Sequence, residues 1–411
     1  MNLDRPIIVA GGGIGGLTAA LAMHRNGVPV AVYERRTEED ILGAPGSGLT
    51  VWSNAATPLG WLGLTKQLLA RSQQIHAIHS YDAKGRPRFL LSTNKHIHPG
   101  ALPSLSIGRF DLADILMSAC RDRGIEVNYG VGVTGYQTAP DHVVVATTDQ
   151  PVVGAALVGA DGVRSAVLGQ LHGRIPERYI GRTTYRGVAQ GAKDLPPGVP
   201  QLFRDDASGI GGGVYPIADD RAAWTLSVRA PAGERDEPGQ QQARAMELAR
   251  VMPAAIRDRV ARTSDEAIIR TDIWYHEWHQ HWGEGLVTLL GDAAHAMPND
   301  LGQGACQAIE DAVVLADALA ARDFSTPGQL PAALRDYEQR RFDRVKWVRA
   351  QSVQVATAPE PTNVLLRWMM RQLARAYLSL AEKPMWRTMQ RVPELTAADT
   401  PLAAAAQSRE A

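Results

Sequence analysis

The sequence predicts an α/β fold: a parallel sheet with helices on its faces, interrupted by a β-rich domain and followed by C-terminal helices. Residues 6–33 have a strand–turn–helix–strand pattern. Between residues 183 and 229, short β-like stretches separated by glycine and aspartate predict hairpins. An apolar strand and a periodic helix then return over residues 286–319, so we expect the first domain to resume there.

These patterns set the expected domain boundaries. The first domain is predicted to be discontinuous, with residues 1–175 and 284–330, and the β-rich domain covers residues 176–283. Residues 331–411 form a C-terminal helical region, with helices over roughly 330–355 and 363–380 and a disordered Ala-rich tail.

Composition narrows the classes of partner and compartment. The 411 residues contain 43 Lys plus Arg and 43 Asp plus Glu, a net charge of zero that argues against nucleic-acid binding and favours small partners. The two cysteines, Cys120 and Cys306, fit neither a disulfide framework nor a zinc site, which favours a reducing compartment. The apolar run 7–10 is too short for a signal peptide and no membrane-length apolar run follows, so we expect a cytoplasmic protein. The sequence leaves the choice between a monomer and a homodimer open.

The opening unit justifies the prediction of a parallel sheet. Residues 6–10 form an apolar strand, the glycines of 11–16 form a tight turn, and a helix over 17–26 ends at Gly27 before a second strand at 28–33. Further along, a helix follows Arg109, with Asp111 as its expected N-cap. Short strands at 143–146 and 156–160 complete this part.

A Gly-x-Gly-x-x-Gly motif occupies the first turn. Gly11 permits the turn, Gly13 lets the backbone approach a pyrophosphate, and Gly16 allows close helix packing. Glu34 ends the next strand, where its carboxylate can accept hydrogen bonds from a ribose. The glycines alone would mean little, but the strand, the helix and the acid around them predict a Rossmann-like dinucleotide site.

A second ligand-binding pattern lies near residue 300. Gly291 and Asp292 follow the strand at 286–290, at the edge of the sheet where doubly wound folds bind ligands. The residues Gly302, Gln303 and Gly304 precede the helix 305–319, whose free N–H groups can hold an anion such as a reduced flavin.

Three motifs in this order resemble those of the single-component flavin-dependent aromatic hydroxylases, the group that includes salicylate and hydroxybenzoate hydroxylases. They are Gly-Gly-Gly-Ile-Gly-Gly at 11–16, Gly-Ala-Asp-Gly-Val-Arg-Ser at 159–165 and Gly-Asp-Ala-Ala-His-Ala-Met at 291–297. The resemblance implies an FAD-dependent monooxygenase that uses NADPH or NADH and O2. Its substrate would be a small aromatic or lipophilic, electron-rich molecule, hydroxylated or epoxidised through a C4a-hydroperoxyflavin.

The same resemblance implies which residues bind the cofactors. The ADP half of FAD would be bound by Gly11, Gly13, Gly16, Glu34 and Arg35. Arg109 would contact the diphosphate region, and Asp292 would bind the hydroxyl groups of the flavin side chain. The isoalloxazine ring would lie against Gly302, Gln303 and Gly304. The Asp-Gly motif of Asp161, Gly162 and Arg164 would serve FAD and the nicotinamide nucleotide together, although an ordinary turn is the alternative. The chain departs from the family's Pro-Asn-Leu-Gly-Gln-Gly by placing Asn299 where proline is usual, so we expect a different loop beside the flavin.

Candidate catalytic residues come from polar positions near the expected ring. Tyr215 follows three glycines and resembles a Tyr-Pro pair that faces the ring in relatives, but a core tyrosine is equally compatible. His295 could orient substrate or flavin, or could be a structural histidine in a turn. Arg186 and Gln201 are weaker candidates.

Two further clusters have simpler interpretations. His276, His279 and His281 alternate with tryptophans, which favours a polar surface strand over a metal site. The helix at 363–380 carries Arg367, Arg371 and Arg375 on one face, which favours an exterior helix over membrane contact.

Rival functions remain at this stage. One is a flavin reductase or dehydrogenase without oxygen insertion, and the other is a catalytically silent flavin-binding protein.

Overall fold

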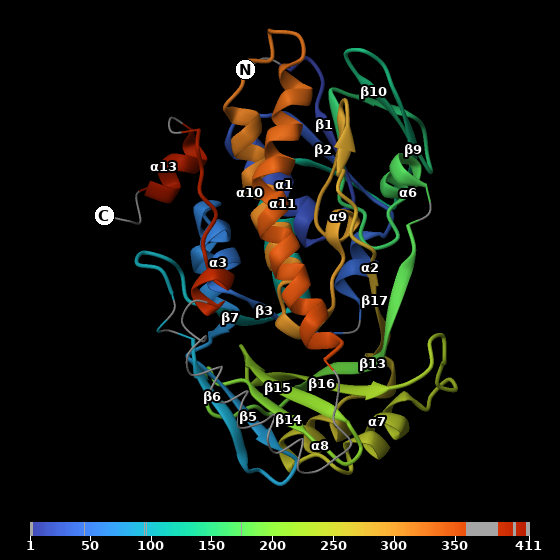
Figure 1. Cartoon of the computed structure of the whole chain (residues 1–411), viewed down its shortest axis with the longest axis vertical. Coiled ribbons are helices and arrows are strands. Elements are labelled where there is room, and N and C mark those ends of the chain that lie inside the picture. The colour runs from blue at the N-terminus through green and yellow to red at the C-terminus, as the bar shows by residue number, and fades with distance from the viewer. Residues whose placement is uncertain are drawn as a thin grey trace.

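A computed structural model describes residues 3–44, 46–93, 95, 97–173, 175–358, 385–397 and 400–407. Two bodies share the molecule, a sheet flanked by helices and a second sheet at one end of it (Figure 1). The helix predicted at 363–380, with its three arginines, lies outside the described residues. Within the part of the chain that is described, no helix combines the length and apolar character that crossing a membrane requires.

The first body is built on a six-stranded sheet with the order β18-β19-β12-β1-β2-β8. Its strands are β18 (Gly283–Glu284), β19 (Val287–Leu289), β12 (Ala156–Gly159), β1 (Ile7–Ala10), β2 (Val30–Glu34) and β8 (Glu126–Tyr129). All neighbours pair in parallel except β18, and every residue of β1 is buried. Because β19 returns to this sheet after the intervening strands, the predicted interrupted α/β arrangement is confirmed.

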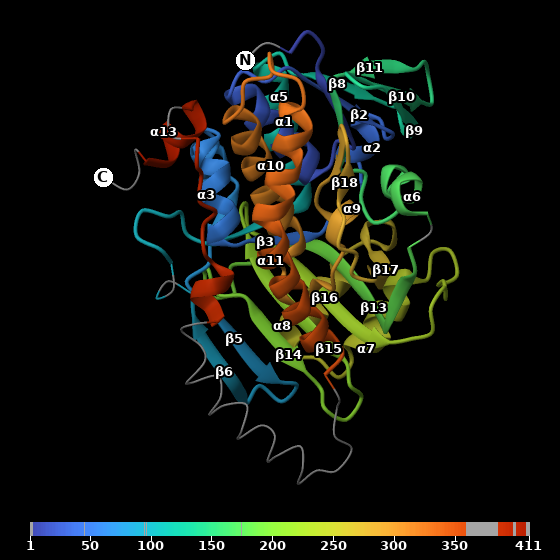
Figure 2. The same ribbon diagram turned by 45° about the horizontal axis from the view of Figure 1, so that its top comes forward.

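Helices pack against this sheet, and two of them approach closely. Helix α1 (Ile14–Arg25) packs against α10 (Gly304–Ala320), which α11 (Gln329–Ala356) covers in turn (Figure 2). A Cβ added at Gly15 would lie 3.0 Å from the Cβ of Ala308, so glycine sets the distance between α1 and α10. The predicted helix after residue 109 is α5 (Arg109–Asp122), but its N-cap is Gly108. The prediction of Asp111 as the cap is wrong, because its carboxylate forms ion pairs with Arg71 and Arg221.

The second body is a seven-stranded sheet with the order β17-β13-β16-β15-β14-β5-β6. Its strands are β17 (Ile269–His276), β13 (Glu177–Gln190), β16 (Arg221–Arg229), β15 (Gly211–Ile217), β14 (Gln201–Arg204), β5 (Ala77–Asp82) and β6 (Pro87–Ser92). Helices α7 (Gln241–Ala249) and α8 (Ala254–Ala261) cover one face with a separate apolar core that includes Val214 and Trp224. Strands β5 and β6 correct the predicted boundary: they come from within residues 1–175, yet β5 pairs with β14.

Smaller elements complete the structure. Two three-stranded sheets have the orders β11-β10-β9 (Val152–Gly154, Val143–Thr147 and Val133–Thr138) and β3-β7-β4 (Gly48–Val51, Leu105–Gly108 and Ser72–Gln74). The remaining helices are α2 (Glu38–Leu42), α3 (Ser53–Trp61), α4 (Thr65–Ala70), α6 (Ala166–His172), α9 (Asp292–His295) and the 3-10 turns η2 (Asp265–Ala267) and η3 (Asn299–Leu301).

The chain beyond α11 docks on the first body where it is described. Helix α13 (Pro401–Gln407) buries Leu402, whose main-chain N–H donates to Asn26 Oδ1 at 3.2 Å. The expectation of a disordered tail is therefore wrong for residues 400–407, because the alanine-rich stretch has an apolar face to bury. Nearby, the main-chain N–H groups of Thr396 and Ala397 donate to Asp317 of α10.

Candidate active site

The glycine turn between β1 and α1 has two tight positions and one open one. Gly11 has a φ of +105°, and an added Cβ there would lie 2.4 Å from the carbonyl oxygen of Ala160. A Cβ on Gly16 would lie 1.9 Å from the carbonyl oxygen of Gly11, which no packing allows. Around Gly13, by contrast, an added Cβ would meet no atom within 4 Å. The turn therefore presents bare backbone to open space at Gly13, as a site for a pyrophosphate requires.

Glu34 ends β2 beside this turn and is nearly saturated with hydrogen bonds. Its Oε2 accepts from the N–H of Gly12 at 2.8 Å, and its Oε1 accepts from the main-chain N–H and the Nε of Arg36 at 3.0 and 3.2 Å. A carboxylate offers about four acceptor positions, so one is left for an incoming hydroxyl. Arg36, which contacts Glu34, was not predicted, and the side chains of both Arg36 and the predicted Arg35 are exposed.

Both helices next to the open space start without a side-chain cap. Neither α1, with Gly13 as N-cap, nor α10, with Gln303 as N-cap, has an acidic residue in its first turn. The positive ends of both helices are therefore open to an external anion.

Asp292 stands at the mouth of α10. It follows Gly291, which has a φ of +64°, and its exposed carboxylate lies 3.8 Å from the position of a Cβ on Gly304. Arg109 is close enough to interact with it: burial lowers the pKa of Arg109, and the charge of Asp292 acts in the opposite direction. The structure thus brings together three predicted residues, Asp292, Gly304 and Arg109, from separate parts of the chain.

Gln303 turns its side chain into the protein. The side chain is buried, and its Oε1 accepts hydrogen bonds from Asn54 Nδ2 and Gln307 Nε2, both at 3.1 Å. A ligand at the start of α10 could therefore meet only the main chain of Gln303. Trp52 Nε1 donates to the carbonyl oxygen of the neighbouring Leu301 at 3.0 Å and holds the same loop from outside.

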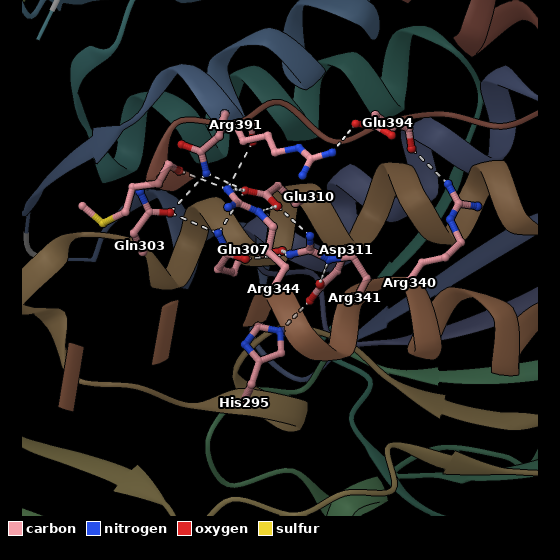
Figure 3. Close-up of polar contacts among 12 residues, drawn as sticks. His295, Gln303, Gln307, Glu310, Asp311, Arg340, Arg341, Arg344, Arg391 and Glu394 are labelled. Atoms are coloured by element: carbon pink, nitrogen blue, oxygen red, sulfur yellow. Dashed lines mark hydrogen bonds and ion pairs between the residues drawn. The ribbon is translucent and has the colours of Figure 1, made fainter. Parts of the chain in front are cut away.

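His295 belongs to a buried ionic network between α10 and α11 (Figure 3). Its Nε2 lies 2.6 Å from Asp311 Oδ2, and Asp311 Oδ1 accepts from Arg341 Nε at 2.7 Å. Burial by itself raises the pKa of Asp311, but His295 and Arg341 outweigh it and leave that pKa below its ordinary value. Arg341 also pairs with Glu310 at 2.6 Å. This geometry favours a positioning role for His295 over contact with substrate, and the sequence analysis missed its partners.

In the Asp-Gly motif after β12, one carboxylate oxygen of Asp161 is hydrogen-bonded to the main chain and the other has no partner among the described residues. Ser165 is the N-cap of α6, and Asp161 Oδ2 accepts from the N–H of Ala166, the first residue of that helix, at 2.7 Å. Its Oδ1 is buried without a partner among the described residues, and burial raises the pKa of this carboxyl. Gly162 has a φ of +82°, and Arg164 is exposed. The free oxygen leaves room for a ligand donor beside the turn.

The face of the seven-stranded sheet opposite α7 and α8 carries Tyr215. The tyrosine folds back over Gly213, where an added Cβ would lie 2.7 Å from the phenolic oxygen. Burial raises the pKa of Tyr215, and a hydrogen bond with the Thr225 side chain acts in the opposite direction. Tyr215 is partly buried, on the side of the sheet opposite the apolar core under α7 and α8.

An ion pair joins this face to the loop before α10. Arg182 of β13 donates to both carboxylate oxygens of Asp300 at 2.7 Å. Asp300 belongs to η3, next to Asn299, where the sequence departs from the family pattern. The unusual loop is therefore anchored to the seven-stranded sheet.

Strand register shows on which face of the seven-stranded sheet Gln201 and Arg204 lie. Gln201 pairs with Val214, whose side chain lies in the core under α8, so Gln201 faces away from Tyr215. Arg204 pairs with Gly211 and so shares the face of Tyr215, although the sequence analysis did not select it. Alternation along β14 was the signal that could have found it.

Two other features lie away from this face. A cavity of about 480 Å³, lined by Tyr185, Asp236 and Arg270 among others, opens on the α7 side of the sheet.

The histidine cluster is not the predicted surface strand, because His276 is buried and Trp282 packs against His295. Among the residues that the structure describes, no three potential metal ligands lie together.

Comparisons with known proteins agree with this geometry. The model of the FAD binding domain family matches residues 4–352. The chain is 34% identical over 380 residues to the aurachin C monooxygenase/isomerase of Stigmatella aurantiaca, covering 91% of this chain and 95% of the relative. It is 30% identical to the FAD-dependent urate hydroxylase of Mycolicibacterium vanbaalenii, covering 88% and 91%. The crystal structure of Klebsiella pneumoniae HpxO with FAD and uric acid superposes with a TM-score of 0.82 at 25% identity, covering 94% and 97%.

Proposed function

The chain belongs to the FAD-binding family of flavin-dependent monooxygenases, and from this membership we propose that it inserts one oxygen atom of O2 into a small aromatic ring with electrons from NADH or NADPH. That it is an FAD-dependent monooxygenase, able to hydroxylate or epoxidise, follows from its relatives. The ring substrate, the nicotinamide nucleotide and a cytoplasmic location are our proposals. The observation that carries the FAD-dependent function is the meeting of Asp292, Gly304 and Arg109 near two uncapped helix starts.

The described residues fit FAD along its length. Bare backbone at Gly13 and the start of α1 would hold the diphosphate, and the last acceptor position of Glu34 would hold a ribose hydroxyl. Asp292 would accept hydrogen bonds from the flavin side chain. Main-chain N–H groups of Gly302–Gly304 would face the ring, where a helix start stabilises negative charge by about 0.3–1 kcal/mol. When bound, FAD supplies the redox chemistry that side chains cannot.

The substrate would lie between this ring and the face of the seven-stranded sheet that carries Tyr215. Tyr215 and Thr225 provide hydroxyl groups there, and the pair of Arg182 and Asp300 closes one side. The names of relatives specify urate and 3-amino-4-hydroxybenzoate, which are both rings that carry oxygen substituents. We therefore propose an oxygenated ring of similar size. Walls of protein around it would exclude water from the reaction.

The variant Asp292→Ala tests the cofactor assignment. We expect it to fold like the wild type but to lose FAD on gel filtration, measured by flavin absorbance per protein, with circular dichroism as the check on folding. The matched control is Asp149→Ala, an exposed aspartate in a distant turn, which should keep its flavin. Equal flavin content in the two variants would contradict the role of Asp292.

Labelled oxygen tests the reaction class. With 18O2 and a ring compound that stimulates NADH or NADPH oxidation, one labelled atom should appear in the product. Stimulated oxidation without label in any product would favour a flavin reductase. A yellow protein that oxidises neither nucleotide faster with any ring compound would favour a silent flavin-binding protein.

A further inference from the structure

We propose that the cavity behind the seven-stranded sheet, lined by Tyr185, Asp236 and Arg270, is a second ligand site that binds a neutral molecule with several hydroxyl groups, such as a sugar or a polyol. The cavity includes none of the residues assigned to FAD, so this site is independent of the oxygen chemistry.

The seven-stranded sheet separates this cavity from the FAD site. Tyr185 of β13 lines the cavity and pairs with Leu226, which belongs to the apolar core under α7 and α8. The next residue, Arg186, pairs with Thr225 and so points to the opposite face, where Tyr215 lies. In Figure 1 the sheet lies between the first body and helices α7 and α8. A ligand in the cavity is therefore remote from the glycine turn and from the start of α10.

One wall of the cavity is the loop between β16 and α7, and two hydrogen bonds hold this loop to β17. The N–H of Gly233 donates to Asp272 Oδ2 at 2.8 Å, and Arg270 donates to the carbonyl oxygen of Glu234. The wall is therefore held in place without a ligand. The volume of about 480 Å³ lies within the range of roughly 300–1,000 Å³ that small-molecule sites occupy.

Two buried polar atoms of residues that line this cavity lack a hydrogen-bond partner among the described residues, Arg270 Nε and Asp236 Oδ2. The side chain of Arg270 is only 7% exposed, and the two atoms lie 3.9 Å apart, too far for a direct hydrogen bond. The other polar atoms of these side chains are engaged: Tyr185 OH donates to Asp236 Oδ1 at 2.9 Å, and Arg270 Nη1 donates to Asp272 Oδ1 at 3.2 Å. Because unsatisfied buried polar atoms are costly, both atoms favour a polar ligand group between them.

The chemistry of these two atoms specifies that group. It must accept a hydrogen bond from Arg270 Nε and donate one to Asp236 Oδ2, and a hydroxyl does both. An anion would be repelled by Asp236, and a cation would be repelled by Arg270. The charge of Arg270 is already balanced by Asp272 at 3.2 Å and by Asp236, so the cavity does not require a charged ligand.

The size of the cavity indicates more than one hydroxyl group. A single water molecule can bridge the two atoms, but it occupies only about 30 Å³ in the liquid, a small part of the cavity of about 480 Å³. Thr183 and Arg244 also line the cavity and add polar groups to its wall. A polyol that fills the cavity therefore gains contacts at several positions, which one water molecule does not.

The test measures binding to the FAD-loaded protein by saturation-transfer NMR. The neutral probes are myo-inositol, D-glucose and glycerol, and the charged probes are acetate, ethylammonium and glycine. We expect at least one neutral probe to bind saturably without a change in flavin absorbance, and every charged probe to bind at least tenfold more weakly. Asp236→Ala removes the acceptor and should weaken binding of the preferred probe tenfold or more.

Arg244→Met and Arg250→Met provide a matched pair. Both arginines are exposed, in α7 and directly after it, but only Arg244 lines the cavity. Arg244→Met should weaken binding of the preferred probe threefold or more, whereas Arg250→Met should bind it like the wild type. Circular dichroism checks the folding of each variant, and this pair decides the question if Asp236→Ala does not fold.

Four results overturn the inference. They are no saturable binding of any neutral probe, stronger binding of a charged probe, wild-type binding by a folded Asp236→Ala, and equal binding by Arg244→Met and Arg250→Met. A neutral probe that changes the flavin absorbance would lie beside the ring instead and would overturn the inference as well. None of these results bears on the FAD-dependent function, which the flavin content and the labelled-oxygen experiment test separately.

Discussion

The carboxylate of Asp311, on helix α10, accepts a hydrogen bond from the main-chain N–H of Gly291, with 3.0 Å between Oδ2 and nitrogen. This bond fixes the turn of positive φ at Gly291 that places Asp292 beside the start of α10. Because His295 and Arg341 hold Asp311 in turn, a buried network behind α10 sets the position of a residue at the site.

Asp311→Asn should therefore lower both stability and FAD affinity. The amide keeps the shape but loses the charge that faces His295 and Arg341, and breaking a buried pair in this way costs about 3 kcal/mol of unfolding free energy. Urea denaturation and FAD titration measure the two effects. Asp323→Asn, at an exposed position just beyond α10, is the control and should change stability by less than about 0.5 kcal/mol. Wild-type FAD affinity in Asp311→Asn would contradict the link between Asp311 and Asp292.

Gly13→Ala and Gly16→Ala should separate ligand binding from folding. A methyl group on Gly13 enters open space, so we expect normal folding but weak FAD binding, because we propose that this space holds the diphosphate. A methyl group on Gly16 collides with the carbonyl oxygen of Gly11, so folding itself should suffer. Thermal melts and flavin content measure this difference. The control is Gly169→Ala in α6, where the added methyl also meets open space and helix propensity improves by about 0.5–1 kcal/mol. Equal flavin content in Gly13→Ala and Gly169→Ala would count against the diphosphate site.

The parts of the fold with strong local patterns were predictable from sequence. The helix expected over 305–319 is α10 (Gly304–Ala320), and the strand–turn–helix opening is β1 and α1. Strands β5 and β6 were not assigned to the β-rich sheet because β5 pairs with β14, more than a hundred residues away, and no local signal reports such a pairing. The prediction of a disordered tail was wrong for residues 400–407, because the alanine-rich helix there packs on the first body through the buried Leu402, and the sequence of the tail alone does not report that contact.

The candidate site was predictable in its backbone and less so in its side chains. Glycines and strand ends located Asp292 and Gly304, because sheet topology alone brings them to one edge. Whether Gln303 and His295 face ligand or interior depends on Arg341, which comes from another helix. One signal was available: Glu310 and Asp311 lie in the middle of an otherwise apolar helix, where buried acids require cationic partners.

Arg182→Gln should impair coupling of oxygen use to product formation. Without the arginine, Asp300 is left unpaired and the 299–301 loop loses its anchor to the seven-stranded sheet. Because misplacement near reacting groups is costly, we expect roughly tenfold lower kcat and more peroxide per nucleotide oxidised. Stopped assays that compare product with peroxide measure this. The double variant Arg182→Asp with Asp300→Arg should recover part of the coupling. If peroxide yield stays at the wild-type level in Arg182→Gln, the ion pair has no part in holding the loop.

Acid should destabilise the protein through His279. Burial lowers the pKa of His279 to about 4, whereas an unfolded histidine titrates near 6.5. Between these pH values the unfolded chain binds a proton that the folded chain refuses, so stability is complete above pH 6.5 and falls as the pH drops towards 4. His279→Asn should remove a loss on the order of 2 kcal/mol between pH 7 and pH 4.5. His24→Asn, at the exposed end of α1, should leave that loss intact. His276 is also buried with a lowered pKa, so some loss of stability in acid should persist in His279→Asn. If the pH dependence of stability in His279→Asn equals that of the wild type, other groups carry the whole effect.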